Sequence, residues 1–327
     1  MAAIRRELLV AERAPRISDT DADAVSVPVL RARVADMQAR HRLAALRSMG
    51  DDLPGLLRDL RVACQVLPAS EQATVYGLRA RAYEATMDML KQTGYVVDST
   101  VAVERARWAA QRADDPLCEL IIDWHYAGEF IRIGELDDAA GIIDAGLAAL
   151  RPLAHLRMDA AALIGMYELK AALVSARAGD AAGLWERWQR AADIAAEIGR
   201  DCEEPLAFGP SNVAIWSVAL PVEMLDAAAA VKRAETVNSA LDELRPAGSI
   251  SKGQYSRERL ARHWVDVARA YHYRADYDRA LTAILKAERL AALRTRIEPS
   301  AREVVGHMLR VRRRGELVEL GLRMGVL

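Results

Sequence analysis

Apolar residues recur at spacings of three and four along most of the chain, inside segments bounded by Gly, Pro, Asp and Ser. This spacing places them on one face of an α-helix, and no segment shows the strict alternation of a strand. A first helix is expected from Ile4 to Glu12, followed by a polar linker. The next helix is expected to begin after Ser26, a residue type that caps helices, with Pro28 in its first turn. The pattern predicts an all-α protein, with 1–25 as an N-terminal helix and linker and 26–327 as one helical-repeat domain.

Turns between the helices are expected where Gly, Pro and Asp interrupt the apolar pattern. They fall at Met49–Asp51, Thr93–Gly94, Asp114–Pro116, Ile133–Glu135, Ala178–Asp180, Glu204–Pro210, Pro246–Lys252 and Arg274–Asp276. If Gly94, Gly134, Gly179, Leu225 and Ala275 are equivalent turns, successive spacings are 40, 45, 46 and 50 residues. Such recurrence is typical of helical-repeat proteins.

The clearest repeat covers 264–290 and places bulky, small and aromatic residues in the order of a tetratricopeptide helix pair. These positions are Trp264, Val267, Ala268, Tyr271, Ala275, Tyr277, Ala280, Ile284 and Ala287. Small residues let two antiparallel helices approach closely, and bulky ones fill the gaps between successive pairs. A second copy covers 126–146 and a weaker third covers 171–191. We therefore predict a tetratricopeptide-like right-handed α-solenoid, with repeats longer than the standard of about 34 residues.

Composition narrows the function classes. The chain has 45 basic and 46 acidic residues and a net charge of -1, which argues against a nucleic-acid binder. No apolar run approaches the roughly 20 residues of a membrane span, and the charged N-terminus is unlike a signal peptide. The three cysteines, Cys64, Cys118 and Cys202, are far apart, as is typical of reduced thiols in a cytoplasmic protein.

Two C-terminal segments resemble a known family. They are FGPSNVAIWSVALPVEMLDAAAAVKRAETV at 208–237 and the ending AREVVGHMLRVRRRGELVELGLRMGVL at 301–327. Both are similar to the C-terminal tetratricopeptide-like domain of actinobacterial Cro-type helix-turn-helix transcriptional regulators. The order of the RRELL stretch at 5–9 and of the segments that follow it agrees with that family. The resemblance therefore extends from about residue 4 to the end, and it implies a role in transcription regulation.

The chain departs from that family at two places. Family members place the DNA-binding domain before the RRELL-like stretch, whereas only about two dozen residues precede the first repeat helix of this chain, too few for such a domain. Either that domain has been removed, or the chain is a stand-alone homologue that has lost it. The resemblance thus implies regulation, while this chain is not expected to bind a specific nucleic acid itself. Pro221 is the second departure, and it is expected to kink or shift its helix.

No catalytic, cofactor or metal motif is present. The sequence lacks a dinucleotide or phosphate-binding glycine loop, a GxSxG elbow and an HExxH pair. No two of the six histidines are three or four residues apart, as a helix-borne metal site requires. Paired acids such as Asp51-Asp52 fall at expected turns, where they suit helix N-termini. The basic run from Arg310 to Arg314 is interpreted as a solvated face, with a phosphate or partner patch as the alternative. We expect neither an enzyme nor a cofactor.

The best candidate site is the concave groove formed by the first helix of each repeat. The repeat alignment assigns eleven residues to it: Trp124, His125, Arg132, Lys170, Arg177, Asn212, Trp216, Glu223, Asp266, Arg269 and His272. This mixture of aromatics, both charge signs and an amide suits a peptide or a small polar ligand. Asn212 resembles the asparagine with which peptide-binding tetratricopeptide domains hold a ligand backbone. Because it follows Gly209-Pro210, it could instead only begin a helix.

Two functions are therefore kept open. The first is a cytoplasmic sensor domain that binds a peptide, a metabolite or a partner protein and relays binding through a change of curvature or homodimerisation. The second is a stand-alone adaptor that brings proteins together. An enzyme without a recognised motif is the least favoured alternative, which a pocket with a strongly shifted carboxylate or histidine would revive.

Overall fold

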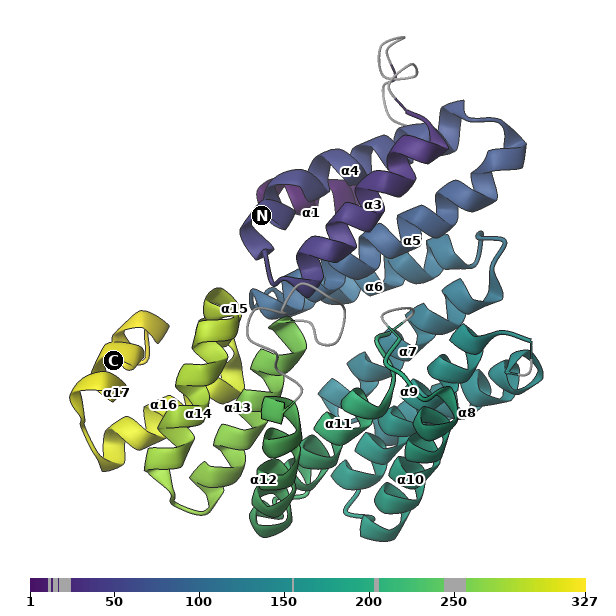
Figure 1. The fold of residues 1–327 in the computed structure, drawn as a ribbon. Helices are drawn as coiled ribbons and strands as arrows, with labels where there is room; N and C mark the ends of the chain where they lie inside the picture. Colours follow the sequence, from purple (N-terminus) through teal and green to yellow (C-terminus); the bar gives the residue numbers. More distant parts are fainter. Residues whose placement is uncertain (11–12, 14–16, 18–24, 155, 203–205, 244–256) are drawn as a thin grey trace. The chain divides into compact units, whose positions relative to one another are not determined.

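The computed structural model describes residues 1–10, 13, 17, 25–154, 156–202, 206–243 and 257–327. Within these ranges α-helices follow one another with one short 3-10 helix and no strand (Figure 1). The predicted all-α class is thus confirmed. Most of the predicted linker before residue 25, and the turn predicted at 246–252, lie outside the described ranges.

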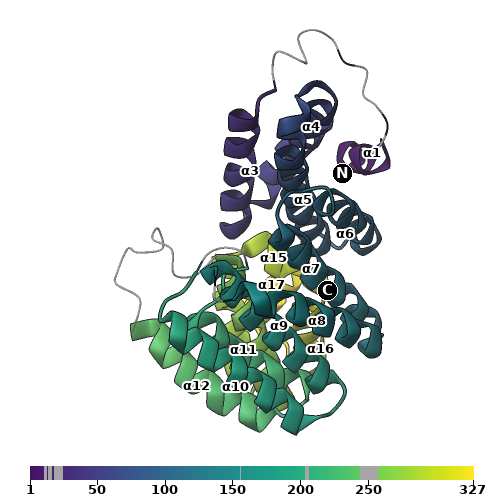
Figure 2. The ribbon, with the colours of Figure 1, turned by 90° about the vertical axis from the view of Figure 1, so that its right-hand side faces the viewer.

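The chain forms two compact units, residues 1–129 and 130–327. The first contains α1 (Ala2–Val10), α3 (Val27–Arg42), α4 (Leu46–Val66), α5 (Ala69–Gln92), α6 (Val96–Ala110) and most of α7 (Pro116–Ile133). Helices α3, α4 and α5 pack on one another, and α6 packs on α5. Helix α1 lies against α4 and α6, as Figure 2 shows. The apolar core of this unit therefore includes the inner face of α4, where Leu53 and Leu60 are fully buried.

The second unit repeats one packing arrangement. It contains α8 (Leu136–Leu150), a 3-10 turn (Arg151–Leu153), α9 (Met158–Arg177), α10 (Ala181–Ile198), α11 (Pro210–Glu223), α12 (Ala227–Glu243), α13 (Arg257–Tyr273), α14 (Tyr277–Leu290), α15 (Ala292–Ile297), α16 (Pro299–Val311) and α17 (Gly315–Met324). Helices α9 and α10, α11 and α12, α13 and α14, and α16 and α17 pack as neighbours. The first helix of each pair also contacts the next first helix, from α9 to α11, to α13 and to α16. One face of the first helices is thereby shared along this unit.

The five turns predicted to be equivalent share one backbone conformation. Gly94, Gly134, Gly179, Leu225 and Ala275 all have positive φ, between 59° and 91°. In each turn, the next residue donates its N–H to the carbonyl five residues earlier, as from Tyr95 to Leu90. This is the Schellman helix ending, which satisfies carbonyls left open at a helix C-terminus. The five predicted turns therefore share one geometry.

One predicted turn is wrong. We expected a turn at Met49–Asp51, but helix α4 runs through these residues and through Pro54. The turn lies earlier, at Ala44, which has a φ of 55° and the same hydrogen bonds as the other five turns. An internal glycine weakens a helix by about 1 kcal/mol and a proline by about 3 kcal/mol. The buried leucines of α4 outweigh these costs, since full burial of each contributes roughly 1.5–3 kcal/mol. The six residues of this face, each at most 4% exposed, are Leu46, Met49, Leu53, Leu56, Leu57 and Leu60.

Small residues allow the close helix contacts that the repeat pattern predicted. Ala268, Ala280 and Ala287 of the clearest repeat are fully buried in the α13–α14 pair. A Cβ added at Gly146 would lie 2.2 Å from the Tyr167 ring, and one at Gly165 would lie 2.0 Å from the Phe208 ring. Both glycines therefore leave room for a fully buried aromatic ring. Helix α11 continues through the buried Pro221 to Glu223, and the Pro221 carbonyl accepts from Asp226.

Candidate functional site

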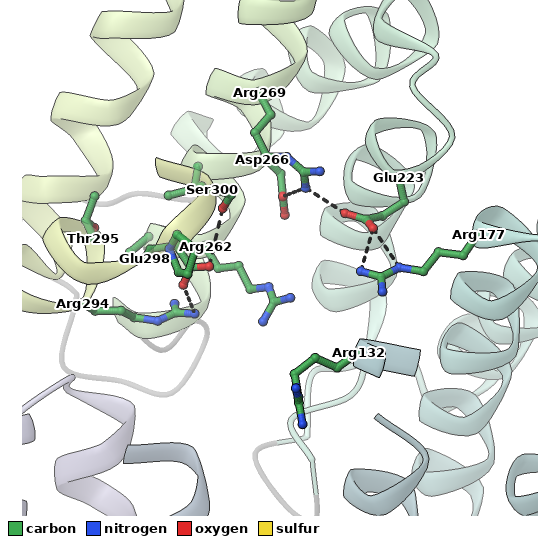
Figure 3. Close-up of a pocket in the computed structure, with 13 residues that line it drawn as sticks. Arg132, Arg177, Glu223, Arg262, Asp266, Arg269, Arg294, Thr295, Glu298 and Ser300 are labelled. Atoms are coloured by element: carbon green, nitrogen blue, oxygen red, sulfur yellow. Dashed lines mark hydrogen bonds and ion pairs between the residues drawn. The ribbon is translucent and has the colours of Figure 1, made fainter. Parts of the chain in front are cut away.

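The second unit contains a polar cavity of about 370 Å³. Side chains from the ends of α7, α9 and α11, from one face of α13, and from α15 and the start of α16 line it (Figure 3). The lining residues are Arg132, Arg177, Glu223, Ala261, Arg262, Val265, Asp266, Arg269, Arg294, Thr295, Glu298, Pro299 and Ser300. Its volume falls within the roughly 300–1,000 Å³ of small-molecule sites.

Three of the lining residues occupy the same position in successive helix pairs. Arg132, Arg177 and Glu223 each lie two residues before the positive-φ residue that ends their helix. Because the turns share one geometry, these side chains leave their helices in the same direction relative to the turn. The repeat itself therefore supplies one side of the cavity.

Glu223 joins two neighbouring repeats. It accepts from Arg269 of α13 at 2.8 Å and from Arg177 of α9 at 2.9–3.0 Å (Figure 3). Burial alone would raise the pKa of Glu223, but Arg269 and Arg177 outweigh it and lower this pKa. The carboxyl group is thus held ionised between two guanidinium groups.

Asp266 is the more deeply buried acid of the cavity, at 9% exposed. It accepts from Arg269 at 3.2 Å, one helical turn away. Burial raises the pKa of Asp266, and the nearby Arg262 and Arg269 oppose this rise without cancelling it. Burial alone would lower the pKa of Arg269, but the nearby Asp266 and Glu223 outweigh this effect and raise it.

Arg294 holds the wall formed by α15. Its guanidinium lies 2.8 Å from Glu258 and 3.7 Å from Glu298, and it donates to the Glu258 carbonyl at 2.9 Å. Only 5% of the Arg294 side chain is exposed. Contacts of this kind fix the wall, because a buried guanidinium needs such partners.

Arg262 differs from the other cavity residues. Its side chain is exposed to the cavity space, and it has no hydrogen-bond or ion-pair partner among the described residues. In Figure 3 it extends from α13 toward Arg177, and no dashed line reaches it. Burial lowers the pKa of Arg262, but Asp266 and Glu298 outweigh this effect and raise it, so the charge is secure.

Five of the eleven residues predicted for the groove line this cavity: Arg132, Arg177, Glu223, Asp266 and Arg269. The other six lie elsewhere among the described residues. Trp124 and His125 belong to the first unit, where their rings meet edge to face. Lys170 is buried, and Trp216 packs on the apolar cluster formed by Ala172, Ala176, Leu184 and Leu220.

Asn212 and His272 also lie outside the cavity lining. Asn212 is only 3% exposed, and its side-chain nitrogen lies 3.1 Å from the Met166 sulfur. His272 Nε2 lies 2.8 Å from His307 Nδ1 and joins α13 to α16. Arg314 of the basic run pairs with Asp278 and does not reach the cavity lining.

Sequence reasoning missed Arg262, Arg294 and Glu298. Arg262 could have been found, because it lies four residues before Asp266 and seven before Arg269, on the same helix face. Arg294 and Glu298 follow α14, beyond the repeat alignment, so no periodic signal pointed to them. We also find no group of three or more His, Cys, Asp or Glu suited to a metal in the described ranges.

The first unit has a polar cluster of its own, centred on Glu84 of α5. Glu84 accepts from Arg81 at 2.9 Å and lies 2.9 Å from His125 Nε2 of α7. Burial alone would raise the pKa of Glu84, but Arg81 and His125 outweigh it and lower it to about 2. Burial also raises the pKa of the nearby Cys118 to about 12, so this free thiol is not activated as a nucleophile.

No protein-family model matches the sequence, and no curated protein does. Among solved structures, the crystal structure of BtubC (BKLC) from P. vanneervenii is similar over 74% of this chain and 91% of that chain. The two share 15% identical residues and a TM-score of 0.48, too distant a likeness to inform function. Across the described ranges, every helix is too short or too polar to cross a membrane.

Proposed function

We propose that this chain is a tetratricopeptide-like helical-repeat domain that binds a ligand in the second unit and serves regulation, not catalysis. The observation that carries this proposal is the cavity lined by the ends of successive first helices. A ligand there would contact several repeats at once. Binding could then change how these repeats stack, which is how a repeat scaffold relays a signal.

The cavity chemistry favours binding over catalysis. Each acid that lines it lies within ion-pair distance of an arginine. General acid–base work needs a pKa near the working pH, and the two arginines on Glu223 move its pKa away from that range. The pKa of Asp266 is raised, but its carboxyl group is held by Arg269 at 3.2 Å. These groups are suited to hold and orient a charged ligand.

A relation to the C-terminal domain of transcriptional regulators, suggested by the two C-terminal segments, is part of this proposal. So is the right-handed solenoid arrangement of the helix pairs. The helix-to-helix contacts from α9 to α16 support the solenoid within the second unit. The stand-alone adaptor is the competing function, and it predicts a partner that does not need the cavity.

Native mass spectrometry of the purified chain, followed by thermal-shift screening against fractionated cell extract, tests the proposal. We expect a retained or stabilising small ligand or peptide whose effect is weakened by Arg262→Gln. The matched control is Arg274→Gln, which changes an exposed arginine outside the cavity lining. A stable protein complex that is insensitive to Arg262→Gln, without any ligand, would favour the adaptor. Neither ligand nor complex across broad screens would refute the binding function.

A further inference from the structure

The arginines and acids of the cavity do not balance. Five arginines line it, namely Arg132, Arg177, Arg262, Arg269 and Arg294, against the three acids Glu223, Asp266 and Glu298. With all eight groups charged, the lining has a surplus of two positive charges, which Glu258, paired with Arg294 just outside the lining, reduces to one. This surplus is local, because the whole chain has a net charge of -1.

The acids are committed to the wall. Glu223 is held by Arg177 and Arg269, Asp266 by Arg269, and Glu298 lies beside Arg294. These contacts order three of the guanidinium groups before any ligand arrives. A ligand bound to them would lose less side-chain entropy than one bound to mobile arginines.

Arg262 is left as the recognition group. It points into the same space as Arg177 and has no ion-pair partner among the residues with described positions (Figure 3). A guanidinium presents a planar fork of donors that matches the oxygens of phosphate or carboxylate.

Resting on the proposed function, we propose that the cavity binds a small organic phosphate monoester, with Arg262 as the principal contact to the phosphate. A phosphate monoester has a charge of roughly -1.5 to -2 near pH 7 and three terminal oxygens, which suits a guanidinium fork in a cavity with a positive surplus. A monocarboxylate offers fewer oxygens and less charge to the arginines, and a cation would be repelled. The volume of about 370 Å³ leaves room for an organic part beside the phosphate.

The test is isothermal titration calorimetry of the full chain at constant ionic strength, with glycerol 3-phosphate as the probe. Glycerol, succinate and a phosphoserine peptide are the comparison compounds. We expect saturable binding of the phosphate ester, none of glycerol, and weaker binding of succinate. Arg262→Gln should weaken the phosphate ester by roughly 10-fold or more, the usual effect of losing a charge-assisted hydrogen bond. Arg274→Gln should stay within about twofold of the wild type, because its side chain lies outside the cavity lining.

Other outcomes would overturn this inference. Equal affinity of Arg262→Gln and the wild type would remove Arg262 as the contact. If succinate binds as tightly as the phosphate ester, the cavity is a general dianion site. If the phosphoserine peptide binds more tightly than the ester, the ligand is a phosphopeptide and not a small molecule. If the extract screen yields an uncharged ligand that still depends on the cavity, the binding function stands and the phosphate proposal alone fails.

Discussion

Both units contain a cluster of charged side chains, but the two clusters differ in how their charges are paired. In the first unit, Glu84, Arg81 and His125 satisfy one another, and at most 18% of each side chain is exposed. In the second unit, the acids are also paired, yet Arg262 is exposed in the cavity and has no ion-pair partner among the residues that the structure describes. The first arrangement serves stability and packing, whereas the second leaves the Arg262 guanidinium available to a ligand. The proposed binding function rests on this unmatched charge in the cavity and not on a buried network.

The largest effect on stability is expected in the cluster of Glu84, Arg81 and His125. Glu84→Ala removes the carboxylate that both Arg81 and His125 contact. Breaking a buried ion pair in this way destabilises a protein by about 3 kcal/mol or more. Denaturant unfolding of the variant and the wild type measures this loss.

Asp36→Ala is the control in the same unit, since the Asp36–Arg40 pair is exposed and contributes about 0.5 kcal/mol or less. If Glu84→Ala costs no more than Asp36→Ala, the cluster is not a stabilising network. The contrast between the units would then disappear.

A smaller loss is expected for Arg269→Ala in the second unit. Glu223 would keep Arg177, while Asp266 would lose its direct partner in a buried setting. We expect a destabilisation of roughly 2 kcal/mol, as for a buried acid that loses one charged hydrogen bond. Thermal unfolding against Arg274→Ala as control measures it, and a neutral Arg269→Ala would show that the wall is not held by this arginine.

The two units should also respond to acid in different pH ranges. Burial lowers the pKa of His263 from 6.5 to about 4, and its Nε2 lies 2.9 Å from Asn238 Oδ1. A lowered folded pKa means that its contribution to stability is present above pH 6.5 and lost as the pH falls toward 4. The same rule places the loss for Glu84 between pH 4.5 and about 2.

Unfolding free energy should therefore fall by about 2 kcal/mol between pH 7 and pH 5 through His263 alone. His263→Gln keeps a donor for Asn238 but cannot titrate, so its profile should be flatter in that range. Glu84→Gln should match the wild-type slope above pH 5 and differ only below it. Equal slopes for His263→Gln and the wild type would show that His263 does not titrate as a buried group.

The smallest effect on stability is expected for Arg262→Ala. Because Arg262 is exposed and has no ion-pair partner within the described part of the chain, it acts on Asp266 only at longer range, and its removal should change the unfolding free energy by less than about 1 kcal/mol. Denaturant unfolding checks this value. A loss above about 1 kcal/mol would mean that Arg262 supports the fold, and a binding defect of Arg262→Gln would then lose its simple interpretation.

Much of the fold could be predicted because its signals are local. Gly94, Gly134 and Gly179 mark helix ends, and the alanines of 264–290 mark a close helix pair. The turn at Ala44 was missed because nothing in its side chain signals positive φ, while Gly50 gave a false signal inside a helix stabilised by burial.

The site was only half accessible to sequence reasoning. Arg132, Arg177 and Glu223 could be found because the repeat fixes their position, and Arg262 shares the helix face of Asp266. Arg294 and Glu298 could not, because they come from a short helix and a loop after the last clear repeat. Which arginine is left without a partner depends on contacts far apart in sequence, such as Glu223 with Arg269.

The turns also show where the stability of the protein can be raised without changing the cavity lining. Ala44, Leu225 and Ala275 adopt a backbone conformation that disfavours any residue with a Cβ by about 1 kcal/mol, whereas the other three turns use glycine. Glycine at these three sites would remove the steric cost of a Cβ at positive φ. None of the three residues lines the cavity. The triple glycine variant should therefore be more stable than the wild type and keep the same ligand preference, which makes it suitable for calorimetry and crystallisation.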